Sequence, residues 1–309
     1  MPGNDRKRVV YILGLNHSGT TIFWRAFRKN KGLLCFDEPF TGDLGVWFPN
    51  DNEKRTFGEY IDVFGGDVEK FKKIYAPISP FQELDCEFTE AQRSYLNFLL
   101  GQGNDIVIDE THLHQHLPAL LALSSGTRVI HLHRRASTFV TSHMRPSWSK
   151  NAGHVRLGVR WMRNEYNKAR FWSRKDILPG MCRGDVIGDN PTSRFGTMLH
   201  AAGYDAKRIM ASSAVVRLLA YWHYYYHHVE SEGRNLFGEK FRTLRYEEFA
   251  TNPQETMTEI YRWLGMDEPV GIVYSDVHPP KPPFRVFDVR WRESAKIAGF
   301  SDEEVDTLL

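Results

Sequence analysis

The sequence has few cysteines and no long apolar run. Cys35, Cys86 and Cys182 are widely spaced and form no CxxC pair, which excludes a disulfide-built scaffold and a cysteine-rich zinc module. No stretch reaches the ~18 apolar residues that a membrane helix needs. The apolar run from Val9 to Leu15 is too short for a signal peptide and predicts a first strand instead.

An excess of one charge is also missing. The 309 residues carry 40 Lys and Arg against 38 Asp and Glu, a formal net charge of +2. Nucleic-acid coats and membrane-surface proteins need a basic excess, so neither class fits. We expect a cytoplasmic protein with reduced thiols, with no nucleic acid as partner and no membrane span. The oligomeric state stays open.

Short apolar runs rich in branched residues alternate with helical stretches. The strands are predicted at 9–13, 33–36, 106–108, 128–132 and 241–244, and helices at 21–29, 89–100 and 213–230. Continuous apolar runs are typical of strands buried on both faces of a parallel sheet. The sequence therefore predicts an α/β fold with a P-loop-like central parallel sheet flanked by helices.

We expect a single domain over residues 1–309. Residues 145–212 contain many Arg, Gly, Asn and Trp and no clear strand, which predicts a helical and looped insertion, or a lid, on the substrate side. The proline-rich segment 279–283 predicts an extended linker. Asn252 and Ser301 each stand where a capping residue begins a helix.

A glycine-rich turn follows the first predicted strand and precedes a helix. Glycines let the backbone approach an anion closely, and the N–H groups of a first helical turn favour negative charge. Gly14 and Gly19 have the spacing of a nucleoside-triphosphate loop, but Thr20 stands where that motif has its lysine. The turn therefore predicts a cradle for a phosphate or sulfate that differs from a triphosphate site.

The stretch H-S-G-T-T at residues 17–21 resembles the 5′-phosphosulfate loop of sulfotransferases, which use 3′-phosphoadenosine 5′-phosphosulfate (PAPS) and release the desulfated nucleotide (PAP). The resemblance implies that the 5′-phosphate is held by Asn16, His17, Ser18, Gly19, Thr20 and Thr21. His17 stands where the family has Lys or Arg, which neutralises the bridging oxygen as the sulfuryl group leaves. A protonated His can do this with a charge that depends on pH.

A second anion site is expected after the strand at 128–132. Arg134 and Ser142 keep the spacing of the family pattern R-D-P-x-x-x-x-x-S, although Arg135 and Ala136 replace Asp and Pro. The resemblance implies that they bind the 3′-phosphate, with the bidentate fork of the guanidinium and a hydroxyl donor.

The segment 244–265 is similar to the L-R-Y-E-D-L…F-L-G segment of the family. This similarity implies that Tyr246 lies near the adenine. The C-terminal Gly-rich loop that binds the cofactor in the cytosolic branch is absent from this sequence. We expect Arg290 to contact the cofactor in its place.

Two residues are candidates for the general base that takes the proton of the acceptor. Glu38 follows the second predicted strand, as a catalytic Glu does in tyrosylprotein sulfotransferases, and His112 stands in a T-H-L segment similar to K-T-H-L-P of the cytosolic branch. Glu110 replaces the Lys of that segment. We favour Glu38 slightly, because Glu-Pro after the second strand resembles the glycan and bacterial branches; His112 stays an alternative, as base or as hydrogen-bond partner of the acceptor.

We predict no metal site. His112, His114 and His116 stand at every second position, and this spacing would not direct all three side chains at one ion. Helix packing or a water-filled pocket explains the second histidine group, His223, His227 and His228, better than a metal site does.

The predicted function is transfer of a sulfuryl group from PAPS to a hydroxyl or amine of a small-molecule or glycan acceptor. In such a reaction, positioning and charge neutralisation dominate. One alternative is a kinase-like phosphotransferase, for which Asp109 is the candidate Mg²⁺ ligand. The other is a catalytically weak nucleotide-binding relative. The sequence does not identify the acceptor.

Overall fold

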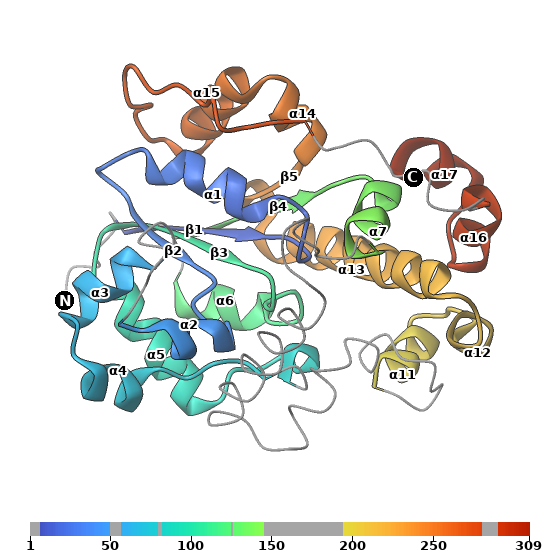
Figure 1. The fold of residues 1–309 in the computed structure, drawn as a ribbon, viewed down its shortest axis with the longest axis horizontal. Coiled ribbons are helices and arrows are strands. Elements are labelled where there is room, and N and C mark those ends of the chain that lie inside the picture. The colour runs from blue at the N-terminus through green and yellow to red at the C-terminus, as the bar shows by residue number, and fades with distance from the viewer. Residues whose placement is uncertain (1–6, 50–56, 80–81, 125, 145–193, 280–289) are drawn as a thin grey trace, which may run out of the picture. The chain divides into compact units, whose positions relative to one another are not determined.

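The computed structural model describes residues 7–49, 57–79, 82–124, 126–144, 194–279 and 290–309. Five parallel strands form one sheet: β1 (Arg8–Leu13), β2 (Leu34–Asp37), β3 (Asp105–Glu110), β4 (Thr127–His133) and β5 (Phe241–Arg245). Their order across the sheet is β2-β3-β1-β4-β5. The predicted α/β fold with a central parallel sheet is confirmed (Figure 1), and each predicted strand is present within a few residues of its expected bounds.

The register of the sheet brings the ends of three neighbouring strands together. Leu13, the last residue of β1, pairs with Glu110 at the end of β3. Asp37, the last residue of β2, pairs with Asp109. The inner strands β1 and β3 are almost wholly buried, as continuous apolar runs predict. Residues that follow these strands therefore share one edge of the sheet, where parallel α/β folds bind ligands.

One face of the sheet is covered by α1 (Thr20–Arg28), α14 (Tyr246–Thr251) and α15 (Pro253–Leu264) (Figure 1). The Phe23 ring meets the ring of Phe249 edge-on, with 4.9 Å between centroids. Such aromatic pairs contribute about 0.5–1.5 kcal/mol beyond the area they bury. The packing fixes α1, and so the loop that precedes it, against the segment that follows β5.

The other face is covered by α3 (Gly58–Phe64), α5 (Glu90–Leu100) and α6 (Leu117–Leu123), with α2 (Gly42–Trp47) and α4 (Val68–Ile74) nearby (Figure 1). The start of α5 is held by a capping box between Thr89 and Gln92. In this box the Thr89 hydroxyl accepts from the Gln92 N–H, and the Gln92 side chain accepts from the Thr89 N–H.

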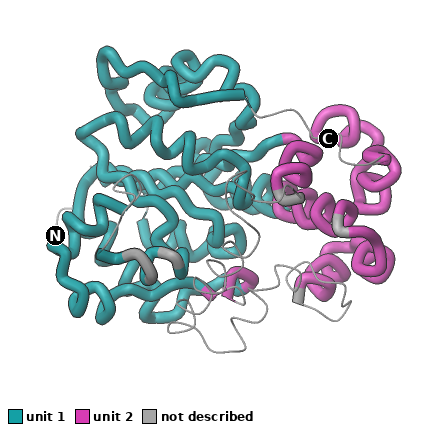
Figure 2. Tube along the Cα trace, in the orientation of Figure 1, with its two compact units in different colours: residues 1–78, 85–134, 228–280 teal, residues 79–84, 135–227, 281–309 magenta. Residues whose placement is uncertain are grey.

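The chain divides into two compact units (Figure 2). Unit 1 holds residues 1–78, 85–134 and 228–280, and unit 2 holds 79–84, 135–227 and 281–309. Besides the 3₁₀ turn η1 (Gln82–Leu84), the helices in the described residues of unit 2 are α7 (Ala136–Met144), α11 (Arg194–Ala201), α12 (Ala206–Met210), the first part of α13 (Ala214–Phe237), α16 (Trp291–Ile297) and α17 (Asp302–Leu308). The expectation of a single domain stays a prediction.

Three sequence-based expectations about helices have mixed outcomes. The capping box predicted at Ser301 is present at the start of α17. Asn252 precedes α15, but its side chain makes no capping hydrogen bond, so that detail of the prediction is wrong. The helix predicted at 213–230 continues to Phe237, and Gly233 within this extension lies closely against the Phe241 ring.

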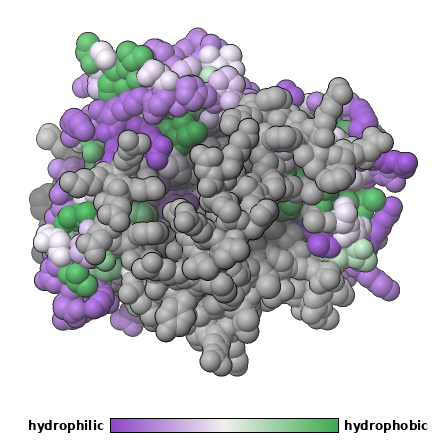
Figure 3. All heavy atoms as spheres, viewed as in Figure 1, coloured by the Kyte–Doolittle hydropathy of each residue, from purple (hydrophilic) through white to green (hydrophobic). Residues whose placement is uncertain are grey.

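Most of the predicted insertion, residues 145–193, lies outside the described residues, as does most of the proline-rich linker. The described remainder of the insertion forms α11 and α12. None of the helices in the described part of the chain is long and apolar enough to span a bilayer. On the face in Figure 3 the described surface mixes hydrophilic and hydrophobic residues, and the exposed large apolar side chains of the described chain are Val270 and Val273.

Candidate active site

The turn between β1 and α1 has the geometry of an anion cradle. Gly19 stands at the N-cap of α1 in the left-handed region, with φ 95° and ψ 12°, and makes no side-chain capping bond. The N–H groups of Ile22 and Phe23 donate to the Gly19 carbonyl, each at 3.1 Å, whereas the first N–H groups of a helix have no partner within it. The amides of Thr20 and Thr21 are therefore in position to donate to an oxyanion.

Space requires glycine at both ends of this turn, and at Gly19 the positive φ requires it as well. A Cβ on Gly14 would lie 2.5 Å from the Leu132 carbonyl oxygen. A Cβ on Gly19 would lie 2.3 Å from Cδ2 of the Tyr246 ring. The turn thus lies directly against the end of β4 and the residue that follows β5, and His17 within it is exposed.

Arg134 and Tyr246 lie beside the same turn. The Arg134 guanidinium donates from Nη1 to the His17 carbonyl oxygen at 2.8 Å, and its Cζ lies 6.0 Å from the centre of the Tyr246 ring. His17 has a positive φ of 70°, which turns its carbonyl toward Arg134. The structure therefore brings together three parts of the predicted nucleotide site: the turn after β1, the residue after β4 and the first residue of α14, which directly follows β5 (Figure 1).

Two other predicted nucleotide ligands belong to unit 2. Ser142 lies on α7, and Arg290 stands just before α16, where its Nη1 is 3.4 Å from Oε2 of Glu293. The Arg290 side chain is 83% exposed. Their assignment to the 3′-phosphate and to the cofactor stays a prediction.

The two candidate bases follow the neighbouring strands β2 and β3. Glu38 has a positive φ of 43°, and its N–H donates to the Asp109 carbonyl at 2.8 Å, which extends the pairing of the strands. The Thr111 hydroxyl donates to Oε1 of Glu38 at 3.0 Å. His112 is the next residue and is half-buried. The sheet therefore brings Glu38 and His112 to adjacent strand ends, next to the start of the glycine turn.

Glu110 holds both of these loops in place. Its Oε1 accepts from the N–H groups of Thr111 at 2.9 Å and His112 at 3.1 Å, and its Oε2 accepts from Phe40 N–H at 3.1 Å. The side chain is fully buried. Burial raises the pKa of Glu110 to about 7, while His112 acts in the opposite direction. Where the sequence resemblance expects a lysine, the structure has a carboxyl group that positions the backbone around the two candidate bases.

A buried pair of carboxyl groups lies behind this edge. Asp37 and Asp109 pair in the register of β2 and β3, and Asp109 is fully buried. Burial raises the pKa of both groups above the usual range for Asp, and the negative charge of Glu38 acts in the same direction. Like charges in one buried site cannot both ionise without a large cost, so the pair retains a proton at neutral pH.

This burial argues against the kinase-like alternative. Asp109 is the carboxylate that alternative assigns to Mg²⁺, and a metal ligand must be ionised and reach the nucleotide. Asp109 is fully buried, so its carboxyl group does not face a nucleotide at the edge of the sheet.

The three histidines at alternate positions after β3, His112, His114 and His116, lie mostly in the protein interior. His114 and His116 are buried, and burial lowers the pKa of His114 well below its usual value. The His116 ring stacks on Phe88 with 4.7 Å between centroids. These two histidines are packing residues of unit 1, and His112 is the member of the series nearest to the strand ends.

Sequence reasoning missed the positioning roles of Glu110 and Thr111. The signal was available in part, since a carboxylate at the end of a buried strand is expensive unless backbone donors surround it. Which amides surround it depends on residues about 70 positions apart, and the sequence alone does not show that pairing.

Comparison with known proteins supports the resemblance over part of the chain. Residues 190–269 match the model of a sulfotransferase family, a segment that contains α13, β5, α14 and α15 but not the glycine turn. The predicted sulfotransferase resemblance is confirmed for this segment. No curated protein matches the chain.

Several solved structures resemble the chain weakly. The sulfotransferase domain from the curacin biosynthetic pathway is 12% identical, with a TM-score of 0.49 over 85% of this chain and 76% of that one. The sulfotransferase domain of the Synechococcus PCC 7002 olefin synthase is 14% identical, with a TM-score of 0.43 over 91% of this chain and 84% of that one. A sulfotransferase from Mycobacterium avium is 13% identical, with a TM-score of 0.44 over 86% of this chain and 65% of that one.

Proposed function

We propose that the protein is a sulfotransferase that moves a sulfuryl group from PAPS to a hydroxyl or amine of a small-molecule or glycan acceptor. The observation that carries the proposal is the convergence of the glycine turn, Arg134 and Tyr246 at the strand ends that adjoin Glu38 and His112. The family match over residues 190–269 also supports it; that segment contains Tyr246 but neither the glycine turn nor Arg134.

The donor nucleotide is held by the turn and by Arg134. The amides of Thr20 and Thr21 and the hydroxyls of Ser18 and Thr20 would donate to the 5′-phosphate, where the helix dipole also favours negative charge. Arg134 would bind the 3′-phosphate with two parallel hydrogen bonds and charge. Tyr246, whose ring lies beside Arg134, would be near the adenine.

The transfer step needs a base on one side of sulfur and charge neutralisation on the other. The acceptor oxygen or nitrogen forms a bond to sulfur, and the bond from sulfur to the 5′-phosphate oxygen breaks. The acceptor proton passes to the Glu38 carboxylate, and the Thr111 hydroxyl orients that carboxylate through its 3.0 Å hydrogen bond. The leaving phosphate oxygen takes the electron pair, and the turn amides with protonated His17 stabilise its charge.

Thermal unfolding with PAP tests the donor site. A ligand that binds only the folded state stabilises it by RT ln(1 + [L]/Kd), about 2.7 kcal/mol at a hundredfold excess over Kd. PAP should raise the melting temperature, and ATP with Mg²⁺ should not. Arg134→Ala should weaken PAP binding about tenfold or more, since hydrogen bonds to charged groups are worth about 1.5–3 kcal/mol. Arg135→Ala, which removes the neighbouring exposed guanidinium, is the matched control.

Each outcome of the assay distinguishes between the candidate functions. Stabilisation by PAP together with transfer of label from a labelled donor to an acceptor mixture supports the proposal. Stabilisation by PAP without any transfer supports the nucleotide-binding relative. If ATP with Mg²⁺ stabilises and PAP does not, the donor assignment is wrong.

A further inference from the structure

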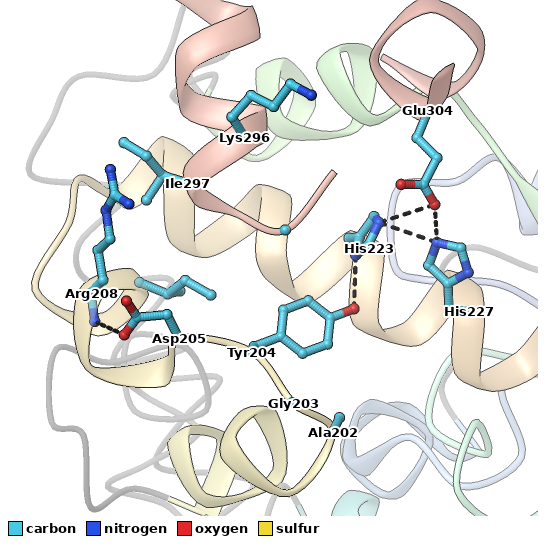
Figure 4. Close-up of a pocket in the computed structure, with 12 residues that line it drawn as sticks. Ala202, Gly203, Tyr204, Asp205, Arg208, His223, His227, Lys296, Ile297 and Glu304 are labelled. Carbon is cyan, nitrogen blue, oxygen red and sulfur yellow. Dashed lines mark hydrogen bonds and ion pairs between the residues drawn. The ribbon is translucent and has the colours of Figure 1, made fainter. Parts of the chain in front are cut away.

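A cluster of two imidazoles and a carboxylate lies in unit 2, outside the residues assigned to sulfuryl transfer. His223 and His227 stand one helical turn apart on α13 and so share a face of that helix. Glu304, on the C-terminal helix α17, points at both rings (Figure 4). Three ligand-type atoms from two helices thus meet at one point.

The distances within the cluster suit a divalent metal ion. The two Nε2 atoms are 3.1 Å apart, and Oε1 of Glu304 lies 3.3 Å from Nε2 of His223 and 2.6 Å from Nε2 of His227. Zinc bonds of about 2.0–2.1 Å in a tetrahedron place neighbouring ligand atoms about 3.3–3.4 Å apart. Two of the three separations are already near that value, and the third needs only a small movement of the Glu304 carboxylate.

Second partners orient the ligand atoms toward the centre. The Tyr204 hydroxyl lies 2.7 Å from Nδ1 of His223, which leaves Nε2 of that ring for the cluster. Oε2 of Glu304 accepts from the Ser301 N–H at 2.7 Å as part of the capping box of α17, which leaves Oε1 for the cluster. Metal-binding histidines and carboxylates are held by outer hydrogen bonds of this kind.

The cluster opens onto a cavity. A cavity of about 450 Å³ in unit 2 is lined by the three ligand side chains together with Tyr204, Arg208 and other residues of α12 and α16 (Figure 4). Three protein ligands and an open side are the pattern of a zinc site that keeps one position for water or a small ligand. Imidazole and carboxylate together favour zinc-class ions over Mg²⁺ and Ca²⁺, which prefer all-oxygen sites.

We propose that His223, His227 and Glu304 bind one divalent metal ion of the zinc class, which joins α17 to α13 and keeps one coordination position open to the cavity. The proposal departs from the sequence-based prediction of no metal, which explained the histidines of this helix by packing. Glu304 is 77 residues (304 − 227) after His227, so no local spacing could reveal the third ligand. The proposal is independent of the proposed sulfotransferase function.

Metal titration of the chelator-treated, tag-free full chain tests the site. Zn²⁺ should bind in a 1:1 ratio in competition with a chromophoric chelator, and Co²⁺ should give the intense visible absorption of a four-coordinate ion. Glu304→Gln is the sharpest variant, because glutamine at this position preserves the capping box and so the start of α17. It should weaken Zn²⁺ binding by at least about tenfold. Substitution of a residue that only hydrogen-bonds to a metal ligand already lowers the metal affinity by about that factor.

Matched variants separate the metal site from general effects of charge and of histidine loss. Glu303→Gln removes the same charge from the adjacent exposed position, and His200→Ala removes an exposed histidine of the same unit; both should keep wild-type affinity. His227→Ala removes a ligand whose side chain is 45% exposed, so the variant should fold and yet lose affinity. Absence of 1:1 binding, or equal affinity of wild type, Glu304→Gln and His227→Ala, would overturn the proposal.

Discussion

Replacement of Gly19 by alanine should destabilise the protein through two separable effects. The first is the backbone, since Gly19 has φ 95°, where an L-residue with a Cβ is strained. The second is packing, since the added Cβ would lie 2.3 Å from Cδ2 and 2.5 Å from Cε2 of Tyr246. The Tyr246 ring cannot yield easily, because it is 4% exposed and its hydroxyl donates to the His278 carbonyl at 2.9 Å.

The size of the effect follows from these two terms. A left-handed backbone costs a non-glycine residue about 1–2 kcal/mol. Overpacking of a close-packed site costs about 1–3 kcal/mol more. The free energy of unfolding should therefore fall by about 2–5 kcal/mol in Gly19→Ala. Gly203→Ala is the matched control, because Gly203 has φ 84° but no atom within 4 Å of the added Cβ, so only the backbone term applies.

Urea unfolding measures both terms at an unchanged m-value. Gly19→Ala should have a lower midpoint than Gly203→Ala, and the difference is the packing term. In a double-mutant cycle, Tyr246→Ala should relieve part of the cost of Gly19→Ala, with an interaction energy of about 0.5–3 kcal/mol. Equal midpoints for the two alanine variants, or strict additivity in the cycle, would show that the turn is not packed against Tyr246 as described.

Three further predictions concern the strand ends. Glu38→Gln and His112→Asn should each lower turnover. In the variant that lacks the true base, the turnover rate should fall about 10²–10⁴-fold, with the affinity for PAP unchanged in the thermal-shift assay. Near-full activity of both variants would mean that neither residue is the base. Glu110→Gln should lower the free energy of unfolding by about 1–3 kcal/mol, because its amide group leaves a buried backbone N–H without an acceptor; an unchanged urea midpoint would contradict the positioning role. Asp37, Asp109 and Glu110 are buried, and their pKa values are raised in the folded state. Their contribution to the free energy of unfolding is therefore fully present below about pH 4, where the carboxyl groups of the unfolded chain are also protonated. It is lost as the pH rises through about 7 to 8. Melting temperatures recorded between pH 5 and 8 at constant ionic strength should fall toward high pH, and Asp109→Asn, which removes one carboxyl of the pair, should flatten that slope; a slope equal to that of the wild type would refute the shared proton.

Much of the local structure could be predicted from the sequence, because it depends on near neighbours in the chain. The apolar run that forms β1, the glycines that follow it and the helix formers after Gly19 each act within a few residues. The capping box at Ser301 is equally local. Asn252 shows the limit of such reasoning, since the residue type suits a cap but its observed φ of −131° and ψ of 64° form no capping bond.

The sequence proposes the residues of the candidate site one by one, but it does not give their arrangement. Sequence spacing singled out His17, Arg134 and Tyr246, and the structure places the last two beside the turn that contains the first. The placement of Ser142 and Arg290 at the nucleotide stays a prediction. The sequence also does not show that Glu304 lies beside His223 and His227, because the helix that carries it is distant along the chain.

The sequence by itself indicated, within a few residues, where the five strands and several of the helices begin, because backbone preference and the period of apolar residues are properties of a short stretch of chain. Tertiary structure alone decided the chemical state of the carboxyl groups. Asp37, Asp109 and Glu110 read as ordinary acids in the sequence, and only the pairing of β2 with β3 buries them together and raises their pKa values. The physical reason is that charge responds to desolvation and to neighbours in space, and strand pairing brings together residues that are far apart along the chain.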